Sequence, residues 1–483
     1  MTLLPITIDR KYFTSYLYGS LMTLISMGIY FSMDSIVHMA VKSQMTLDPS
    51  GEFFRHWLEV PIPITFKYYL FHIDNPEDIL NGGKPRVSER GSMQFEKITE
   101  VKNYKSEFRM WRYKEILKWA DDRSTVKYFE YNKFEFDGEN TNSILSPFVY
   151  RMLNLFLSVH RQHLFTIQTV NEVIHGKRVE MFNTITTLMK PLDWLGIKNL
   201  PKNAMPPNNT VGLLVGRNNI PEGPIEVYTG ITDVGIATQI SSWKNEKTLK
   251  LWKTSPCNMI NGSDGSLFKP GLKFGDSLYT FTGDLCRSTK LVFDRESEHM
   301  GIPTYRYVDD PTLLMGTKSA PENECFCLHK DKMKCEIDGL LDLSHCQFGA
   351  PLLITKPHFL SFPHLQNKVD GLQPNENDHI SYMEIQPTLG TPLYCIKRMM
   401  FVIRVENNPR ISAYRNIRNN FIPFFWIEVE GGLNETFANQ IMYSFVYPLQ
   451  ATIVATTALG ITGIAMLFTT FARQWFKMET KVQ

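Results

Sequence analysis

Two long apolar stretches without charged residues lie at opposite ends of this 483-residue chain. The first runs from Tyr12 to Met33, and the second runs from Phe437 to Ala472, with its most apolar part at 449–471. A helix needs roughly 20 residues to cross the hydrocarbon core of a bilayer, and it satisfies its own backbone polar groups there. The sequence therefore predicts transmembrane helices at 12–33 and 444–472, with one large domain at 34–443 between them.

The basic residues near these stretches predict their orientation. They lie at the outer end of each stretch: Arg10, Lys11, Arg473, Lys477 and Lys481. Because basic residues collect on the cytosolic side of a membrane, we expect tails 1–11 and 473–483 to be cytosolic. The large domain is then extracellular or lumenal. A cleaved signal peptide is the alternative for the first stretch, but no small-residue cleavage site follows Met33.

Small residues recur every four positions in both predicted spans. Ser15, Gly19 and Thr23 do so in the first span, and Thr452, Thr456 and Gly460 do so in the second. Small residues at this spacing let helices approach closely in lipid. We expect these two faces to pack together or to mediate self-association, so a homo-oligomer stays open.

Composition and motifs favour neither an enzyme nor a nucleic-acid partner. The net charge is +2, and no block of Lys and Arg is present. The sequence contains no Walker loop, HExxH motif or G-x-S-x-G motif, so we expect no catalytic residue, cofactor or metal. Two-span ectonucleotidases need paired phosphate loops, whereas Asp264-Gly265-Ser266 stands alone. Two-span ion channels usually need polar pore elements, whereas 449–471 offers, beyond Gln450 at its start, only Thr, Gly and Ala.

All seven cysteines lie between the two apolar stretches. Six of them fall within 257–346, and Cys395 is left over. In an exported domain this pattern predicts a disulfide-rich region. A zinc site is the alternative, but the cysteine spacing does not match paired C-x₂₋₄-C knuckles. Six cysteines allow fifteen pairings for each choice of the free one, so spacing alone assigns no bond.

Three N-x-S/T triplets also lie in the large domain, and they begin at Asn208, Asn261 and Asn434. Such triplets are glycosylation acceptors in lumenal or extracellular domains. We therefore expect a glycoprotein that is modified at these three asparagines.

The pattern of apolar residues predicts an α+β domain. Aromatic and β-branched residues bounded by Pro, Gly or Asn predict strands. The predicted strands are Phe66–Phe71, Val126–Phe136, Val211–Val215, Ile225–Thr229 and Met400–Val405. The segment 146–195 instead shows helical spacing over three runs, which begin near Ser146, Phe165 and Met181. The second run ends near Gly176. A helical cluster is thus predicted within a domain that is mainly β.

Short stretches along nearly the whole chain resemble the class B scavenger receptor family. This family of two-pass glycoproteins includes fatty acid translocase, the type 2 lysosomal integral membrane protein and insect sensory neuron membrane proteins. The matching stretches are Phe71–Glu77, Cys257–Asp264, Asp284–Ser288, Gly301–Tyr307, Cys325–Cys327, Pro357–Phe359, Asp370–Glu376, Gly390–Leu393 and Lys397–Arg398.

The resemblance implies a fold and a function. The implied fold is an irregular antiparallel β-barrel with a helical apex at 146–195 and an internal tunnel that carries lipid towards the bilayer. The implied ligands are fatty acids, sterols, carotenoids or lipoproteins. A sorting receptor for a protein partner and a pheromone or odorant co-receptor of the sensory neuron type are the alternatives.

The resemblance also implies specific site residues. The implied disulfides are Cys257–Cys325, Cys286–Cys346 and Cys327–Cys335, with Cys395 free. Basic groups at the apex would capture anionic lipids, lipoproteins or an acidic partner by long-range attraction. The candidates for capture are Arg151, His160, Arg161, His163, Lys177 and Arg178. An ordinary solvated helical face is the alternative interpretation of these residues.

The chain departs from the family pattern in two places. It has Gly91-Ser92-Met93 where the family usually has Gly-Pro-Tyr, which removes a proline and an aromatic side chain. The tails contain no cysteine for palmitoylation, and 473–483 has no acidic dileucine signal of the lysosomal kind. We therefore expect the plasma membrane, with the lysosomal or endosomal membrane as the alternative.

Overall fold

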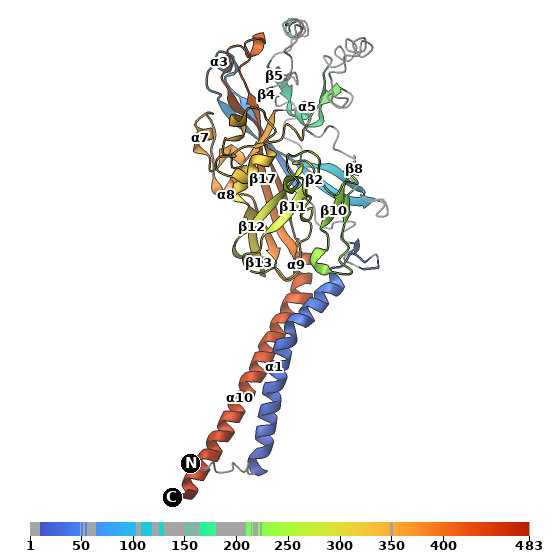
Figure 1. Ribbon diagram of the computed structural model, residues 1–483, viewed down its shortest axis with the longest axis vertical. Coiled ribbons are helices and arrows are strands. Elements are labelled where there is room, and N and C mark those ends of the chain that lie inside the picture. Colours follow the sequence, from blue (N-terminus) through green and yellow to red (C-terminus); the bar gives the residue numbers. More distant parts are fainter. Residues whose placement is uncertain are drawn as a thin grey trace. The chain divides into compact units, whose positions relative to one another are not determined.

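The structure is a computed structural model (Figure 1). It describes residues 10–48, 50–51, 54–55, 64–102, 108–117, 125–129, 151, 154, 158, 164–179, 209–213, 215, 221–222, 225–347 and 351–482. The chain divides into two compact units. One consists of Met1–Met45, Met300–Ile302 and Leu433–Gln483, and the other consists of Thr46–His299 and Pro303–Gly432.

Long helices from the two ends of the chain dominate the first unit. They are α1 (Arg10–Gln44) and α10 (Tyr447–Val482), and α10 is preceded by α9 (Glu435–Ile441) and the π-helical turn η9 (Met442–Val446). By length and composition, Tyr12–Ser43 and Glu435–Lys477 are able to span a membrane. Both helices continue beyond the apolar stretches. This is possible because the backbone hydrogen bonds of an α-helix form in water as well as in lipid. The expected membrane boundaries stay a prediction.

Small residues bring α1 and α10 into close antiparallel contact (Figure 1). The Ser26 hydroxyl donates to the carbonyl oxygen of Thr456 at 2.9 Å. A Cβ atom added at Gly460 would lie 3.4 Å from Ser26 Cβ, and one added at Gly463 would lie 2.9 Å from the carbonyl oxygen of Gly19. The predicted packing through small residues is confirmed, although Gly460 faces Ser26 and Gly463 is the residue that faces Gly19.

A 12-stranded sheet forms the framework of the second unit. Its strands follow the order β11-β12-β13-β16-β17-β18-β1-β2-β3-β8, and β15 pairs with β14 and β17. Antiparallel pairing is continuous from β13 to β8. The bounds are β1 (Ile64–Ile73), β2 (Val87–Lys102), β3 (Phe108–Leu117), β8 (Pro221–Glu222), β11 (Leu278–Thr282), β12 (Arg287–His299), β13 (Ile302–Asp309), β14 (Leu341–Asp342), β15 (Leu352–Thr355), β16 (Tyr382–Gln386), β17 (Thr391–Val405) and β18 (Asn420–Gly432).

Smaller elements surround this sheet. Three two-stranded sheets pair β9 (Ile225–Val227) with β10 (Ile240–Trp243), β4 (Thr125–Phe129) with β5 (Phe165–Thr169), and β6 (Lys177–Arg178) with β7 (Thr210–Val211). The short α-helices are α3 (Pro76–Leu80), α5 (Val170–His175), α7 (Pro363–Gln366) and α8 (Glu376–His379). The mixture of strands and helices confirms the α+β class. The closed barrel and its tunnel stay predictions.

The departure at Gly91-Ser92-Met93 lies inside β2. Tyr69 of β1 pairs with Ser92 and Leu70 pairs with Arg90, so Gly91 is an extra residue opposite the Tyr69–Leu70 step. One unpaired residue in an antiparallel pair is a β-bulge. β2 therefore continues through this segment with a bulge, and no proline is needed to turn the chain there.

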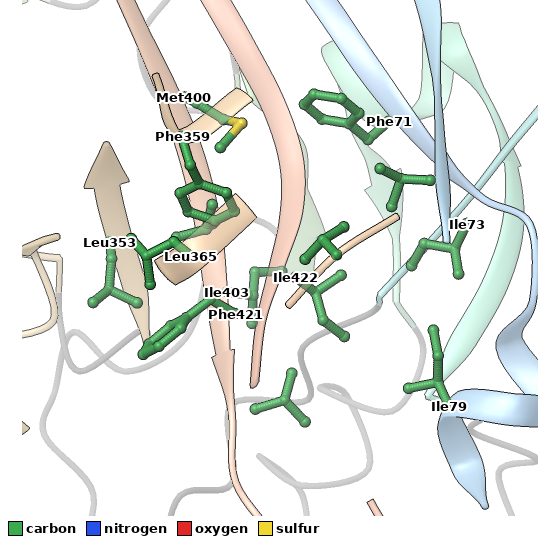
Figure 2. Close-up of a cluster of buried hydrophobic side chains, with 14 of the residues drawn as sticks. Phe71, Ile73, Ile79, Leu353, Phe359, Leu365, Met400, Ile403, Phe421 and Ile422 are labelled. Atoms are coloured by element: carbon green, nitrogen blue, oxygen red, sulfur yellow. The ribbon is translucent and has the colours of Figure 1, made fainter. Parts of the chain in front are cut away.

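The largest hydrophobic core joins the sheet to the segment that follows β15 (Figure 2). Met400 of β17 and Ile422 of β18 are fully buried there with Phe359 and Leu365. Phe71 and Ile73 of β1 belong to the same cluster. Burying an apolar side chain of this size stabilises the fold by about 1.5–3 kcal/mol, so this cluster holds the centre of the sheet in place.

The predicted helical segment 146–195 is partly wrong. Residues 151, 154 and 158 are helical, but Phe165–Thr169 is strand β5, which pairs with β4, and helix α5 begins only at Val170. The Thr169 side chain accepts from the backbone of Glu172 in a capping box, which starts the helix at that point. Gly176 ends α5 with a φ of 104°, as predicted. The third predicted helix, near Met181–Met189, lies outside the described residues.

The predicted strands differ in their outcome. Phe66–Phe71 lies within β1, and Met400–Val405 lies within β17, so both are confirmed. β9 ends at Val227, two residues before the predicted end. Val211–Val215 is wrong beyond Val211, where β7 ends, because the chain turns there: the backbone N–H of Val215 donates to the carbonyl oxygen of Gly212 at 3.3 Å. Of Val126–Phe136, the part to Phe129 is strand β4, and the rest lies outside the described residues.

Candidate functional site

The structure contains three disulfides in the cysteine-rich region. They join Cys257 to Cys325, Cys286 to Cys346, and Cys327 to Cys335, which are the three pairs that the family resemblance implies. Closing a loop by a disulfide contributes about 2–4 kcal/mol, mainly by restricting the unfolded chain. Cys395 forms no disulfide, and burial raises the pKa of its thiol to about 11. Its thiolate is therefore scarce at neutral pH.

Three neighbouring strands of the large sheet present an apolar face. Side chains that lie directly opposite each other on paired strands share a face, and so do alternate residues along one strand. Three cross-strand rows on β17, β18 and β1 follow from the register. The rows, which together define the apolar face, are Lys397–Val429–Phe66, Met399–Ile427–Tyr68 and Phe401–Phe425–Leu70.

Aromatic contacts run across the apolar face. The ring of Phe401 stacks on that of Phe425 with centroids 4.5 Å apart, and the ring of Tyr68 lies 6.3 Å from that of Phe425. Val170, Val173 and Ile174 of α5 belong to the same hydrophobic cluster. In contrast, Met399, Phe401, Ile427 and Val429 are only half-buried. The face is thus an apolar wall that the rest of the domain covers only in part.

The opposite side of the same strands carries charge in one part, next to Met400 and Trp426 of the main hydrophobic core. Glu428 accepts from Lys67 Nζ at 2.6 Å and from Arg398 Nε at 2.6 Å, although Glu428 is only 6% exposed. Glu430 accepts from Lys67 at 3.0 Å and from the Tyr394 hydroxyl at 2.8 Å. We call Lys67, Arg398, Glu428, Glu430 and Tyr394 the ionic face. Buried charges are tolerated only when they are paired in this way.

One charged residue stands on the apolar face. Lys397 lies between Cys395 and Met399 on β17, and its ammonium lies 4.0 Å from a carboxylate oxygen of Asp309. Among the described residues, Asp309 is the ionic partner of Lys397, and the distance between the two charged groups is long. A weakly paired cation beside apolar side chains suits the acidic head of an amphipathic molecule.

A cavity of about 710 Å³ lies at the same strand. β17 pairs with β16 through Ile396 and with β15 from Met400 onward, so Lys397–Met399 lies between these two partners and lines the cavity. Apolar lining residues come mainly from one hydrophobic cluster and its neighbours: Leu285, Leu313, Leu314, Leu341, Ile354 and Met399. This volume lies in the range of ligand pockets, about 300–1,000 Å³.

The predicted capture residues are only partly described. Arg151 is exposed, and Lys177 and Arg178 are exposed next to each other on β6. The ammonium of Lys177 lies 3.8 Å from Glu172, which offsets part of its charge. His160, Arg161 and His163 lie outside the described residues. The capture role of all six residues stays a prediction.

The predicted glycosylation sites differ in exposure. Asn434 is exposed and caps α9, where its Oδ1 accepts from the backbone N–H of Phe437 at 3.0 Å. Asn261 is half-buried beside Ser288, whose hydroxyl accepts from its backbone N–H. Asn208 lies outside the described residues.

Comparison with known proteins identifies the family. Residues 17–474 match the CD36 family model. The chain is 28% identical to scavenger receptor class B member 1 of Bos taurus over 88% of this chain and 82% of the relative. It is also 28% identical to sensory neuron membrane protein 1 of Mamestra brassicae over 84% of this chain and 80% of the relative. The class B scavenger resemblance is thereby confirmed, and the chain is a membrane receptor of the CD36 family.

Proposed function

We propose that this protein binds lipids or lipoproteins through the domain between its spans and passes lipid to the membrane along the apolar face. The function is non-enzymatic, because transfer of an intact lipid makes and breaks no covalent bond. The observation that carries the proposal is the half-buried apolar wall formed by β17, β18 and β1.

The energetics favour such a route. Removing one CH₂ group from water is favourable by about 0.8 kcal/mol. Exposing the acyl chain of a lipid to water therefore costs this free energy for every CH₂ group. Side chains such as Met399, Ile427 and Phe401 keep that surface covered during transfer. The paired charges of the ionic face hold the same strands from behind, so the wall keeps its shape as lipid moves.

Capture of the ligand is assigned to basic residues. Arg151, Lys177 and Arg178 are exposed, and His160, Arg161 and His163 complete the predicted set. Cations on a surface attract anionic particles over about a Debye length, and salt weakens the attraction. In this scheme the basic set controls capture, and the apolar face controls transfer.

A charge reversal separates these two steps. The variant Arg161→Glu, Lys177→Glu, Arg178→Glu is expected to lower cell uptake of an anionic lipoprotein and to reduce its salt dependence. Transfer into the cell of a neutral lipid that is already bound to the protein should change little. Equal loss of both uptakes with normal surface expression contradicts the scheme, and so does the absence of any change.

The proposed orientation follows from the basic residues that flank the two spans. The two tails are cytosolic, and the receptor functions at the plasma membrane with glycans at Asn208, Asn261 and Asn434. Changing each asparagine to Gln should lower the apparent mass by one glycan for every acceptor in use. Antibody access to an N-terminal epitope tag only after permeabilisation would support the cytosolic tails.

A second candidate is a co-receptor for an odorant or pheromone. The observation that favours it is the similarity to sensory neuron membrane protein 1 over 84% of this chain. Extracting the purified protein and identifying the lipids by mass spectrometry distinguishes the two: fatty acids, sterols or carotenoids support the first candidate, and a volatile long-chain ester, alcohol or aldehyde supports the second.

A further inference from the structure

Arg287, at the start of β12, is a half-buried cation whose inner nitrogen is inaccessible and which has no counter-charge among the described residues. Its guanidinium lies over the ring of Phe326 at 3.6 Å. Its Nε is inaccessible and has no hydrogen-bond partner. Among the residues that the structure describes, none places a carboxylate oxygen within 4.0 Å of a nitrogen of this side chain. The segment is held in place by the neighbouring Cys286, which forms a disulfide with Cys346.

Such a group needs an acceptor. Burial lowers the pKa of Arg287 to about 10, so the guanidinium stays protonated at neutral pH. The contact with Phe326 covers one face of the guanidinium, but the N–H donors point outward in its plane. A buried charge without a partner is costly, and a bound ion is an ordinary way to satisfy it.

The side chain of Arg287 lines a cavity of about 60 Å³. Three described lining residues are permanent cations, namely Arg287, Lys334 and Arg404, whereas Asp342 is the single carboxylate among the described residues of the lining. Lys334 is paired with Glu406, 2.8 Å away, so the uncompensated charge is that of Arg287. Lys334 belongs to the 3₁₀ turn η6 (Lys332–Cys335), Asp342 to β14 and Arg404 to β17. The cavity therefore connects the disulfide-rich region to the large sheet.

The single carboxylate is already occupied. Asp342 Oδ2 lies 2.8 Å from His329 Nε2 and 3.1 Å from Arg404 Nη2. Burial opposes its ionisation, but the hydrogen bond from His329 and the charge of Arg404 hold the pKa of Asp342 well below its usual range. Asp342 thus pairs with Arg404 and His329, and among the described residues it forms no ion pair with Arg287.

A metal ion is the alternative occupant. His329, Asp342 and His345 offer ligand atoms that all lie within 4.8 Å of one another, a spacing that a zinc ion tolerates. However, Arg404 contacts the same oxygen of Asp342, and its Nη1 lies 3.4 Å from His329 Nε2. A divalent cation placed there would face a guanidinium at close range, so the lining favours negative charge.

We propose that this cavity binds one small inorganic anion, chloride or phosphate, between Arg287 and Arg404. Each water in the liquid occupies about 30 Å³, so the volume accepts an ion of this size and excludes an acyl chain. The anion neutralises the excess positive charge of the lining. It thereby fastens β12 and the Cys286–Cys346 disulfide to β17, independently of the lipid function.

Thermal unfolding of the purified full-length protein in detergent tests the proposal. Sodium gluconate, whose anion is too large for the cavity, is replaced by sodium chloride or by sodium phosphate at constant ionic strength. A ligand that binds only the folded state raises the unfolding temperature saturably, by about 2 °C or more at concentrations well above its Kd. The salt that stabilises at the lower concentration identifies the anion.

Three variants assign the effect to the cavity. Arg287→Gln removes the charge and is expected to abolish the anion-dependent rise. Lys318→Gln removes an exposed cation that pairs with Glu336 outside the cavity, and it should keep the full rise. Arg287→Lys keeps the charge but loses the planar donors, so a smaller rise is expected.

Three results would overturn the proposal. The first is an unfolding temperature of the unaltered protein that is the same in all three salts, a result that needs no variant to fold. The second is an equal anion-dependent rise in Arg287→Gln. The third is a rise produced by zinc in gluconate that is lost in His345→Ala, which would make the cavity a cation site.

Discussion

The rings of Phe401 and Phe425 stack with their centroids 4.5 Å apart and their planes 15° apart, and this contact joins β17 to β18 on the apolar face. On the reverse side of the same two strands, Arg398 Nε lies 2.6 Å from Glu428. One strand pair thus carries an aromatic contact on one face and an ion pair on the other. The two faces have different functions in our account, and each is open to a separate test.

Truncating the aromatic contact should weaken the sheet moderately. Phe401→Ala removes a stacked ring from a half-buried position, so we expect a loss of about 2 kcal/mol in the free energy of unfolding, below the cost at a fully buried site. Tyr228→Ala, at a position that is 47% exposed, should cost less than half as much. Urea denaturation of both variants measures the difference. Equal losses would mean that the Phe401–Phe425 contact contributes nothing specific.

Removing the carboxylate at the centre of the ionic face should be costlier. Glu428→Gln leaves Arg398 without its ion pair, because Lys67 alone keeps a second acceptor in Glu430. Breaking one side of a buried ion pair costs about 3–5 kcal/mol. The matched variant Glu246→Gln breaks an exposed pair with Lys250 and should cost less than about 1 kcal/mol. Denaturation in urea compares the two, and similar costs would contradict a structural role for the ionic face.

Acid should destabilise the domain through His379. Burial, and then the neighbouring His358, lower the pKa of His379 to about 4, and its Nδ1 accepts from the backbone N–H of Asn375 at 3.0 Å. The unfolded chain titrates near the ordinary value of 6.5 and therefore binds this proton first. Proton uptake then favours unfolding, so the stability present above pH 6.5 falls as the pH decreases towards 4.

Unfolding temperatures at pH 7.5, 5.5 and 4.5 measure this loss. In His379→Gln the decrease in stability between pH 7.5 and 4.5 should be smaller by about 1 kcal/mol, because the titrating group is gone. His364→Gln, at an exposed position, should keep the original pH dependence. A variant at His379 that follows the original curve would show that another group controls the acid response.

Cysteine crosslinking tests the contact between α1 and α10. A Cβ added at Gly460 lies 3.4 Å from the Cβ of Ser26, close to the separation of about 3.5–4.5 Å that a disulfide requires. Ser26→Cys with Gly460→Cys should therefore crosslink within one chain under mild oxidation. Gly28→Cys with Gly460→Cys should not, because a Cβ at Gly28 meets nothing within 4 Å. Crosslinking of the second pair alone would require a different helix register.

Local patterns in the sequence predicted the elements whose structure depends on local chemistry. The aromatic run at Phe66–Phe71 is a strand, and the apolar ends of the chain are helices. The segment Phe165–Thr169 was predicted to be helical because its apolar residues fit both periods. Its strand form depends on pairing with β4, about forty residues earlier in the chain, and a single sequence does not reveal that partner.

The site depends still more on distant contacts. Lys67 and Glu428 are 361 residues apart in sequence, so their ion pair could not be predicted without the register of β1 and β18. The alternation of Glu428 and Glu430 with apolar neighbours was the available signal for a strand with one charged face. Arg287 lies in the family-like stretch Asp284–Ser288, but the lack of a hydrogen-bond partner at its Nε becomes visible only once the chain is folded.

Photolabelling with a lipid tests the central claim most directly. The purified full-length protein is loaded with a long-chain fatty acid that carries a photoactivatable group on its acyl chain, irradiated, digested and mapped by mass spectrometry. We predict labelled peptides from β17 and β18 that include Met399 and Ile427. We also predict that Ile427→Gln lowers this labelling several-fold, whereas the matched Ile231→Gln, at a position that is 51% exposed, leaves it unchanged. Labelling confined to α1 and α10, or labelling of β17 and β18 that is equal in both variants, would contradict a lipid route along the apolar face.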